Sequence, residues 1–226
     1  WPERFPIEKL ERIKRRVGSY FWNALFQQRP RPPEGSKFKI EWIRTVDNFP
    51  RLPGTRYVRF WDLAGTAAGG DYTVGALVAR TPDGMYYLID VARGQWSSGR
   101  RDAEIRSTAI LDADTYGAEV VIWGEQEPGS SGIDAAAAFR KNLEGFNVHT
   151  EPASGSKELR ADPLASAAEG RTFAFVRGAW NAAARREFAD FPRGKHDDTV
   201  DATSGAYNKL ARGRRPFNPN ELERAA

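Results

Sequence analysis

Carboxylate side chains occur at three points of this 226-residue chain where an expected core element ends or begins. These residues are Asp62 after RYVRFW, Glu125 and Glu127 after EVVIWG, and Asp197, Asp198 and Asp201 in GKHDDTVDATSGAY. Residues just beyond the carboxyl ends of neighbouring strands converge on one crevice of an open sheet. On a helix, Asp197 and Asp201 lie one turn apart and project from the same face. Acids that are distant in the sequence can therefore share one pocket.

Such a pocket favours a divalent metal ion. Three or four carboxylates that lie close together repel one another unless a cation lies between them. The chain has no Cys and only two His, which excludes thiolate sites and argues against a multi-histidine zinc site. Hard oxygen ligands select Mg²⁺ or Mn²⁺. Two such ions about 4 Å apart catalyse in-line phosphodiester hydrolysis, so the acids predict this chemistry.

Each acid taken alone also has a structural explanation. Asp197 and Asp198 could cap the last long helix and complement its dipole. Glu125 and Glu127 could be acids of a surface loop. Asp62 has few structural uses, because its strand is expected to be buried on both faces and a buried carboxylate needs an Arg, backbone donors or a metal ion.

The elements that must position these acids form a mixed sheet. Expected strands cover residues 57–63, 72–80, 85–92, 119–124 and 146–150, and expected helices cover 99–116 and 133–143. The first three strands follow one another with short connections, which predicts an antiparallel meander. The later succession of strand, helix and strand predicts parallel pairing through a right-handed crossover. The expected fold class is therefore α/β, with a mixed sheet covered by helices on both faces.

Composition limits the class of protein and its surroundings. Hydrophobic residues make up 40% of the chain, which is enough to bury the core of one domain with an appendage. A net charge of +4 permits a polyanionic partner without requiring one. The chain has no run of about eighteen apolar residues and no signal segment, so we expect a soluble intracellular protein with no membrane partner.

Five segments, in their order and spacing, resemble the C-terminal nuclease domain of the large terminase subunit of tailed bacteriophages and prophages, an RNase H-like fold. They are FWDLAGTAAGGDYTVGALV, YYLIDVARGQW, VVIWGEQEPGSSG, SGSKELRADPLASAAEGRTFAFV and FPRGKHDDTVDATSGAY. The resemblance implies an RNase H-like nuclease domain at residues 56–211. Residues 1–55 read as a helical and Pro-rich segment, and residues 212–226 as a basic tail. The resemblance implies that residues 1–55 are a linker from a missing ATPase domain, although a helix packed on the nuclease domain is an alternative.

The same resemblance implies roles for individual acids. Asp62, Glu125, Asp197 and Asp198 match the metal-binding acids of the nuclease, and Asp62, Glu125 and Asp198 form the expected catalytic set. Glu125 is preferred to Glu127 because it lies closer to the strand end. Additional candidates for the site are Glu127, Asp201 and Asp71.

A basic pair completes the expected site. Lys157 and Arg160 fall where the family has two basic residues beside the active site. Such charges would neutralise backbone phosphates without reading bases, although solvated charges on a helix are an alternative. The resemblance implies double-stranded DNA as the substrate, cut in concatemeric form in the cytoplasm of an infected or lysogenic bacterium. It further implies the terminase ATPase domain, the small terminase subunit and the portal as partners.

The chain departs from a complete large terminase subunit in one respect. No GxxxxGK[ST] motif occurs, so the chain lacks a phosphate-binding loop and is not expected to hydrolyse ATP. The leading hypothesis is an endodeoxyribonuclease that uses two Mg²⁺ or Mn²⁺ ions. One alternative is a non-catalytic module that guides DNA or docks on the portal. Another is a different RNase H-like nuclease, such as a resolvase or transposase core.

Overall fold

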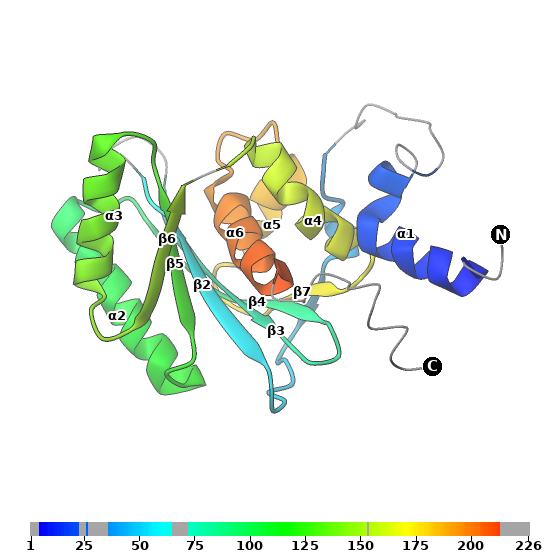
Figure 1. Ribbon diagram of the computed structural model, residues 1–226, viewed down its shortest axis with the longest axis horizontal. Helices are drawn as coiled ribbons and strands as arrows, with labels where there is room; N and C mark the ends of the chain where they lie inside the picture. The colour runs from blue at the N-terminus through cyan, green and yellow to red at the C-terminus, as the bar shows by residue number, and fades with distance from the viewer. Residues whose placement is uncertain (1–4, 23–25, 27–35, 65–71, 153, 213–226) are drawn as a thin grey trace.

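The computed structural model describes residues 5–22, 26, 36–64, 72–152 and 154–212, which form a mixed sheet with helices packed on it (Figure 1). The strands are β1 (Arg44–Val46), β2 (Arg56–Asp62), β3 (Thr73–Arg80), β4 (Tyr86–Gly94), β5 (Val121–Gln126), β6 (Asn147–Pro152) and β7 (Phe173–Val176). The helices are α1 (Ile7–Phe21), η2 (Ile40–Trp42), α2 (Ser98–Tyr116), α3 (Ser130–Asn142), α4 (Lys157–Glu169), α5 (Asn181–Asp190) and α6 (Asp198–Arg212). Among these helices, none has the length and apolar character that crossing a bilayer requires.

The seven strands lie in the order β1-β7-β4-β3-β2-β5-β6. Strands β2, β3 and β4 pair antiparallel, as the short connections between them predicted. Strand β5 pairs in parallel with β2 and with β6, as the crossover through α3 requires. Strand β7 pairs in parallel with β4 and with β1. The predicted α/β class with a mixed sheet is therefore confirmed.

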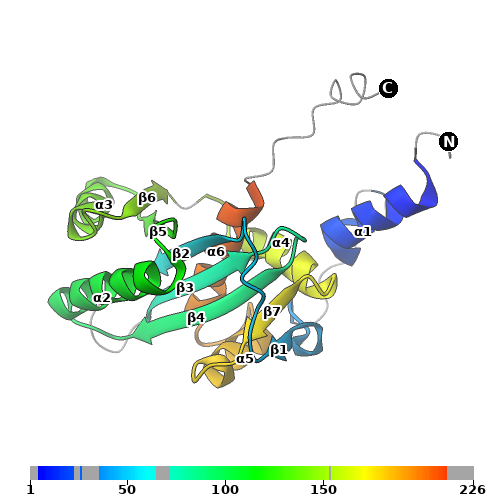
Figure 2. The same ribbon diagram turned by 90° about the horizontal axis from the view of Figure 1, so that it is seen from below.

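Helices cover both faces of the sheet. Helices α4, α5 and α6 lie on one face, and α2 and α3 lie on the other (Figures 1 and 2). Successive side chains of a strand point to opposite faces. In β2, Phe60 accordingly packs in the core with α6, whereas Trp61 packs with Ile105 of α2 and Phe139 of α3. Both faces of this strand are buried, as its run of aromatic and branched residues indicated.

Two short strands were not predicted from the sequence. Strand β1 has three residues and β7 has four, too few to show a period of their own. Strand β1 lies within residues 1–55, the segment expected to be a linker, and it adds an edge strand to the sheet. Phe38 and Ile43 of the same segment are buried in the core under α5. The division into domains stays a prediction, but the sheet and its core extend before residue 56.

A buried ion pair fastens α2 to the sheet. Arg59 donates to both carboxylate oxygens of Asp112 at 2.7 Å from Nε and from Nη2. Its Nη1 donates to the carbonyl oxygen of Gly75 at 2.8 Å and lies 2.9 Å from a carboxylate oxygen of Asp90. Burial alone would lower the pKa of Arg59, but the hydrogen bond and charge of Asp112 raise it. Arg59 therefore remains charged inside the sheet, opposite the face that carries α6.

Candidate functional site

Asp62 and Glu125 lie at the carboxyl ends of two neighbouring parallel strands. Asp62 is the last residue of β2. Glu125 lies within β5, which extends to Gln126, and not just beyond the strand as the sequence indicated. Each acid comes two residues after an aromatic side chain of the core under α6, Phe60 in β2 and Trp123 in β5. Both carboxylates therefore project from the face of the sheet that α6 covers.

Helix α6 adds two buried acids to this face. Asp198 is its first residue and Asp201 lies in its first turn, with only 3% and 4% of each residue exposed. The helix approaches β2 closely because Gly205 has no side chain. A Cβ atom at Gly205 would lie 2.6 Å from the ring of Phe60. Asp197 precedes the helix, and its Oδ1 atom accepts a hydrogen bond from Lys157 of α4.

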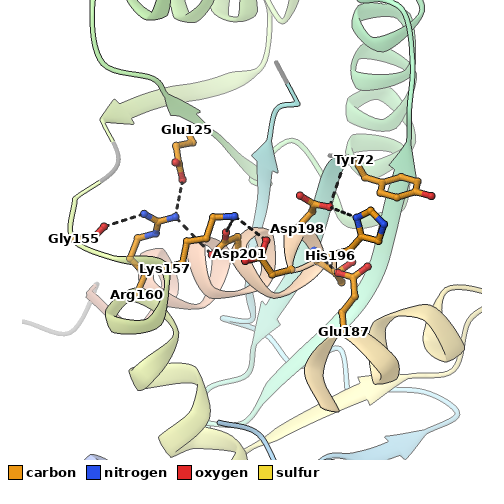
Figure 3. Close-up of polar contacts among 11 residues, drawn as sticks. Tyr72, Glu125, Gly155, Lys157, Arg160, Glu187, His196, Asp198 and Asp201 are labelled. Atoms are coloured by element: carbon orange, nitrogen blue, oxygen red, sulfur yellow. Dashed lines mark hydrogen bonds and ion pairs between the residues drawn. The ribbon is translucent and has the colours of Figure 1, made fainter. Parts of the chain in front are cut away.

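Asp198 is held by residues on the side away from α4. Its Oδ2 atom accepts a hydrogen bond from the backbone N–H of Tyr72 at 3.2 Å. The same oxygen lies 3.9 Å from Nδ1 of His196, whose ring meets the Tyr72 ring edge-on with centroids 5.1 Å apart. Figure 3 shows these three side chains beside one another at the start of α6. The carboxylate orientation of Asp198 is therefore set by its neighbours.

Two basic side chains of α4 lie among the acids (Figure 3). Lys157 Nζ lies 2.8 Å from Oδ1 of Asp197 and 2.8 Å from Oδ2 of Asp201. Arg160 Nη2 lies 3.6 Å from Glu125 Oε2 and 3.6 Å from Asp201 Oδ1. The predicted basic pair thus lies beside the acids, and both members form ion pairs with them.

The acids carry more negative charge than these cations neutralise. Burial raises the pKa of Asp62 to about 8, and repulsion from Asp201 and Glu125 acts in the same direction. Burial also raises the pKa of Asp201, although the hydrogen bond from Lys157 opposes this change. For Lys157, burial alone would lower the pKa, but hydrogen bonds to Asp197 and Asp201 raise it. A further cation among the acids would relieve the repulsion that Asp62 experiences.

The donor set fits a divalent cation by its chemistry. Carboxylate oxygens are the ligands that Mg²⁺ and Mn²⁺ prefer, and Asp62, whose pKa is raised first by burial, also has Asp201 and Glu125 as acidic neighbours. Within the described residues, however, no three His, Cys, Asp or Glu side chains are grouped so as to hold a metal ion. Lys157 and Arg160 lie between the acids instead. Metal binding therefore requires these side chains to rearrange.

Glu125 borders two cavities. A cavity of about 290 Å³ is lined by Asp62, Glu125, Glu127 and the first turn of α3. A second cavity, of about 610 Å³, is lined by Glu125, Arg160 and Asp201. The acids of β2, β5 and α6 are therefore reached from the surface on both sides of Glu125.

Comparison with known families shows which family this domain belongs to. The family model described as the terminase RNase H-like domain matches residues 59–210, which includes every acid of the site. The chain belongs to this family. The terminase nuclease fold that the sequence predicted is confirmed, and the alternative of a resolvase or transposase core is not favoured. No curated protein matches the chain.

Solved structures of terminase nucleases have the same fold. The large terminase nuclease of thermophilic phage G20c with bound magnesium is 17% identical, with a TM-score of 0.54 over 79% of this chain and 99% of that one. The Thermus phage P74-26 large terminase nuclease domain is 17% identical, with a TM-score of 0.57 over 81% and 100%. The manganese-soaked, inhibitor-bound human cytomegalovirus terminase nuclease domain is 11% identical, with a TM-score of 0.57 over 76% and 94%.

The terminase domain brings together most of the residues predicted for its site. Glu127 is exposed and lines the smaller cavity with Asp62 and Glu125. Asp71, the remaining candidate, lies outside the described residues. Sequence reasoning missed Tyr72 and His196, which flank Asp198. The sequence did carry a signal for both, because Tyr72 directly follows Asp71 and His196 directly precedes Asp197.

Proposed function

We propose that this terminase domain is an endodeoxyribonuclease that hydrolyses phosphodiester bonds of double-stranded DNA with Mg²⁺ or Mn²⁺. The observation that carries the proposal is the convergence of Asp62, Glu125 and Asp198 on one face of the sheet. Burial raises the pKa of Asp62 to about 8, and the neighbouring acids add to the rise, so a divalent cation bound there would favour the ionised carboxylate. Membership of the terminase family and the metal-bound terminase nucleases of similar fold support this assignment.

Each acid has a proposed role in this reaction. Asp62, Glu125 and Asp198 hold the catalytic ions, and Asp197 is a further ligand. Glu127 and Asp201 are additional candidates that line the two cavities. When two ions are bound, they supply an activated water and stabilise the leaving oxygen. The backbone N–H of Tyr72 would hold Oδ2 of the Asp198 carboxylate in place during the reaction.

Lys157 and Arg160 are proposed to exchange partners when the site is loaded. In the structure they form ion pairs with Asp197, Asp201 and Glu125. With the acids engaged by metal, Lys157 and Arg160 would be free to contact backbone phosphates of DNA. Phosphate contacts fix the position of the duplex and carry no sequence information. This exchange would couple metal binding to DNA binding.

The wider setting is proposed from the family. We infer that the substrate is concatemeric viral DNA, cut during genome packaging in the cytoplasm of an infected or lysogenic bacterium. The proposed partners are a terminase ATPase domain, a small terminase subunit and a portal. The acids proposed for hydrolysis all lie within this chain, so the isolated chain is the protein on which the activity is tested.

The test is the conversion of supercoiled plasmid to nicked and linear forms. We expect cleavage with Mn²⁺, no cleavage with EDTA, and loss of cleavage in Asp62→Asn. Asp114→Asn is the matched control, because Asp114 is an exposed acid of α2. A folded wild-type protein that binds plasmid but leaves it intact in Mn²⁺ would support the non-catalytic docking module instead. Equal cleavage by wild type and Asp62→Asn would contradict the assignment of the site.

A further inference from the structure

Arg93 of β4 contacts two residues that both reach the start of α6. Its guanidinium carbon lies 3.6 Å from the centroid of the Tyr72 ring. Its Nη2 atom lies 2.7 Å from Oε1 of Glu187 in α5. A cation this close to an aromatic face and to a carboxylate is attracted electrostatically by both. Arg93 therefore joins the segment before β3 to α5.

The two partners of Arg93 hold consecutive residues of α6. Tyr72 donates its backbone N–H to Oδ2 of Asp198 at 3.2 Å. Glu187 accepts the backbone N–H of Thr199 through Oε2 at 2.8 Å. Glu187 and Asp198 both lie close to His196 and the first turn of α6 in Figure 3. Arg93 thus contacts one residue that bonds the carboxylate of Asp198 and a second residue that bonds the backbone directly after Asp198.

The contacts of Glu187 differ from those of a surface ion pair. Only 7% of Glu187 is exposed, and it supplies the carboxylate that caps the amino end of α6. A carboxylate at a helix amino end is favoured by the helix dipole and by free N–H groups. Arg93 neutralises this buried acid on its other oxygen. Without Arg93, Glu187 would be an unpaired buried charge close to the acids of the site.

We propose that Arg93 is a positioning residue of the nuclease, which holds Asp198 in place through Tyr72 and Glu187 without touching metal or DNA. This inference rests on the proposed function, because it assigns Asp198 as a metal ligand. Residues that orient a ligand typically change metal affinity or activity by about 10- to 100-fold when they are replaced. Arg93, Tyr72 and Glu187 together hold Asp198, and we call these three residues the brace.

The experiment compares three variants with the wild type. Arg93→Met removes the brace. The double variant Arg93→Met with Glu187→Gln removes it while leaving the net charge unchanged, and Gln can still accept the N–H of Thr199. Arg80→Met is the matched control. Arg80 also lies over a tyrosine ring, at 5.6 Å from Tyr86, and its Nη1 bonds the carbonyl oxygen of Leu210 near the other end of α6.

Two quantities are measured on each protein. Amide hydrogen exchange in EDTA reports the protection of the Tyr72 and Thr199 N–H groups without any metal or DNA. Calorimetry reports the affinity for Mn²⁺. We expect faster exchange at both amides and about 10-fold weaker Mn²⁺ binding in the two Arg93 variants. Arg80→Met should match the wild type in both measurements.

The possible outcomes separate the brace from the proposed function. Wild-type exchange at Tyr72 and Thr199 in Arg93→Met would overturn the brace. Faster exchange with unchanged Mn²⁺ affinity would overturn the positioning role and leave Arg93 a structural residue. Equal effects in Arg80→Met would also overturn it, because general loosening of α6 would then be the cause. If the wild type neither binds Mn²⁺ nor cuts DNA, the proposed function fails, and the exchange data alone decide whether Arg93 braces Asp198.

Discussion

Lys157 and Asp201 form an ion pair in which Nζ lies 2.8 Å from Oδ2, at the centre of the acidic site. The lysine begins α4 and the aspartate lies in the first turn of α6, so the pair joins two helices that pack on the same face of the sheet. The ammonium also lies 2.8 Å from Asp197. The Lys157 ammonium group therefore competes with a divalent metal ion for Asp197 and Asp201.

Replacing Lys157 by Met should make the metal-free protein less stable and its metal binding tighter. The buried Asp201 loses its nearest counter-charge, which should lower the free energy of unfolding in EDTA by about 1 kcal/mol. The same loss removes a competitor for the acids, so the Kd for Mn²⁺ should fall. Urea unfolding and calorimetry measure the two effects. Lys141→Met, at an exposed position of α3, should change neither, and weaker Mn²⁺ binding by Lys157→Met would contradict the competition.

Replacing Lys157 and Arg160 together by Ala should weaken DNA binding to the same degree for every sequence. Each phosphate contact that is lost reduces the slope of log K against log salt concentration by about 1, so the double variant should lower the slope by about 2. Fluorescence anisotropy with two unrelated duplexes over a salt series measures this. Arg44→Ala with Arg186→Ala removes two exposed cations away from the acids and is the control. A loss confined to one sequence would indicate base readout.

Gly205→Ala should destabilise the domain by moving α6 away from β2. The added Cβ would lie 2.6 Å from the ring of Phe60, and overpacking of this kind costs about 1–3 kcal/mol. Because α6 carries Asp198 and Asp201, Mn²⁺ binding should weaken as well. Gly99→Ala is the control, since a Cβ there meets no atom within 4 Å. Urea unfolding and calorimetry of both variants test this, and a fully stable Gly205→Ala protein would contradict the packing argument.

Asp62 should make the metal-free protein less stable as the pH rises. Its pKa is about 8 in the folded state, above the ordinary value of 3.8, so folding favours the neutral carboxyl. The stability that this preference contributes is complete below the ordinary pKa of 3.8, and it is lost as the pH rises through the folded-state pKa of about 8. Asp62→Asn removes this dependence. In EDTA, the variant should therefore gain stability relative to wild type between about pH 4 and pH 8, and a constant difference would contradict the raised pKa.

The sequence predicted the sheet wherever a strand was long enough to show its own pattern. Strands β2 to β6 were expected within two residues of their observed starts. Strand β7 has only four residues, and its place between β1 and β4 depends on pairing with distant segments. The buried Arg59 could not be recognised either, because its partner Asp112 is 53 residues away and on a helix. Such long-range contacts leave no periodic signal in the sequence.

The candidate site was predictable as a set of acids but not as a set of contacts. The three acidic segments that contain Asp62, Glu125 and Asp198 were located because strand ends and helix starts can be read from local patterns, and the choice of these three acids as a catalytic set came from the family resemblance. The pairing of Lys157 with Asp201 depends on how α4 and α6 pack, which no local pattern specifies. Glu187 was not considered, because an acid inside a short helix has many ordinary surface roles. Its burial and its contact with Thr199 appear only in the folded chain.

The central claim is that Asp62 belongs to a metal-dependent catalytic site, and the most direct test is the rate of plasmid nicking by Asp62→Asn in Mn²⁺. An amide is a much poorer ligand for a hard cation, so the rate should fall by orders of magnitude. The melting temperature in EDTA, measured on the same sample, should equal or exceed that of the wild type because repulsion among the acids is relieved. A variant that melts at a lower temperature but nicks plasmid at nearly the wild-type rate would show that Asp62 is structural, and would contradict the account.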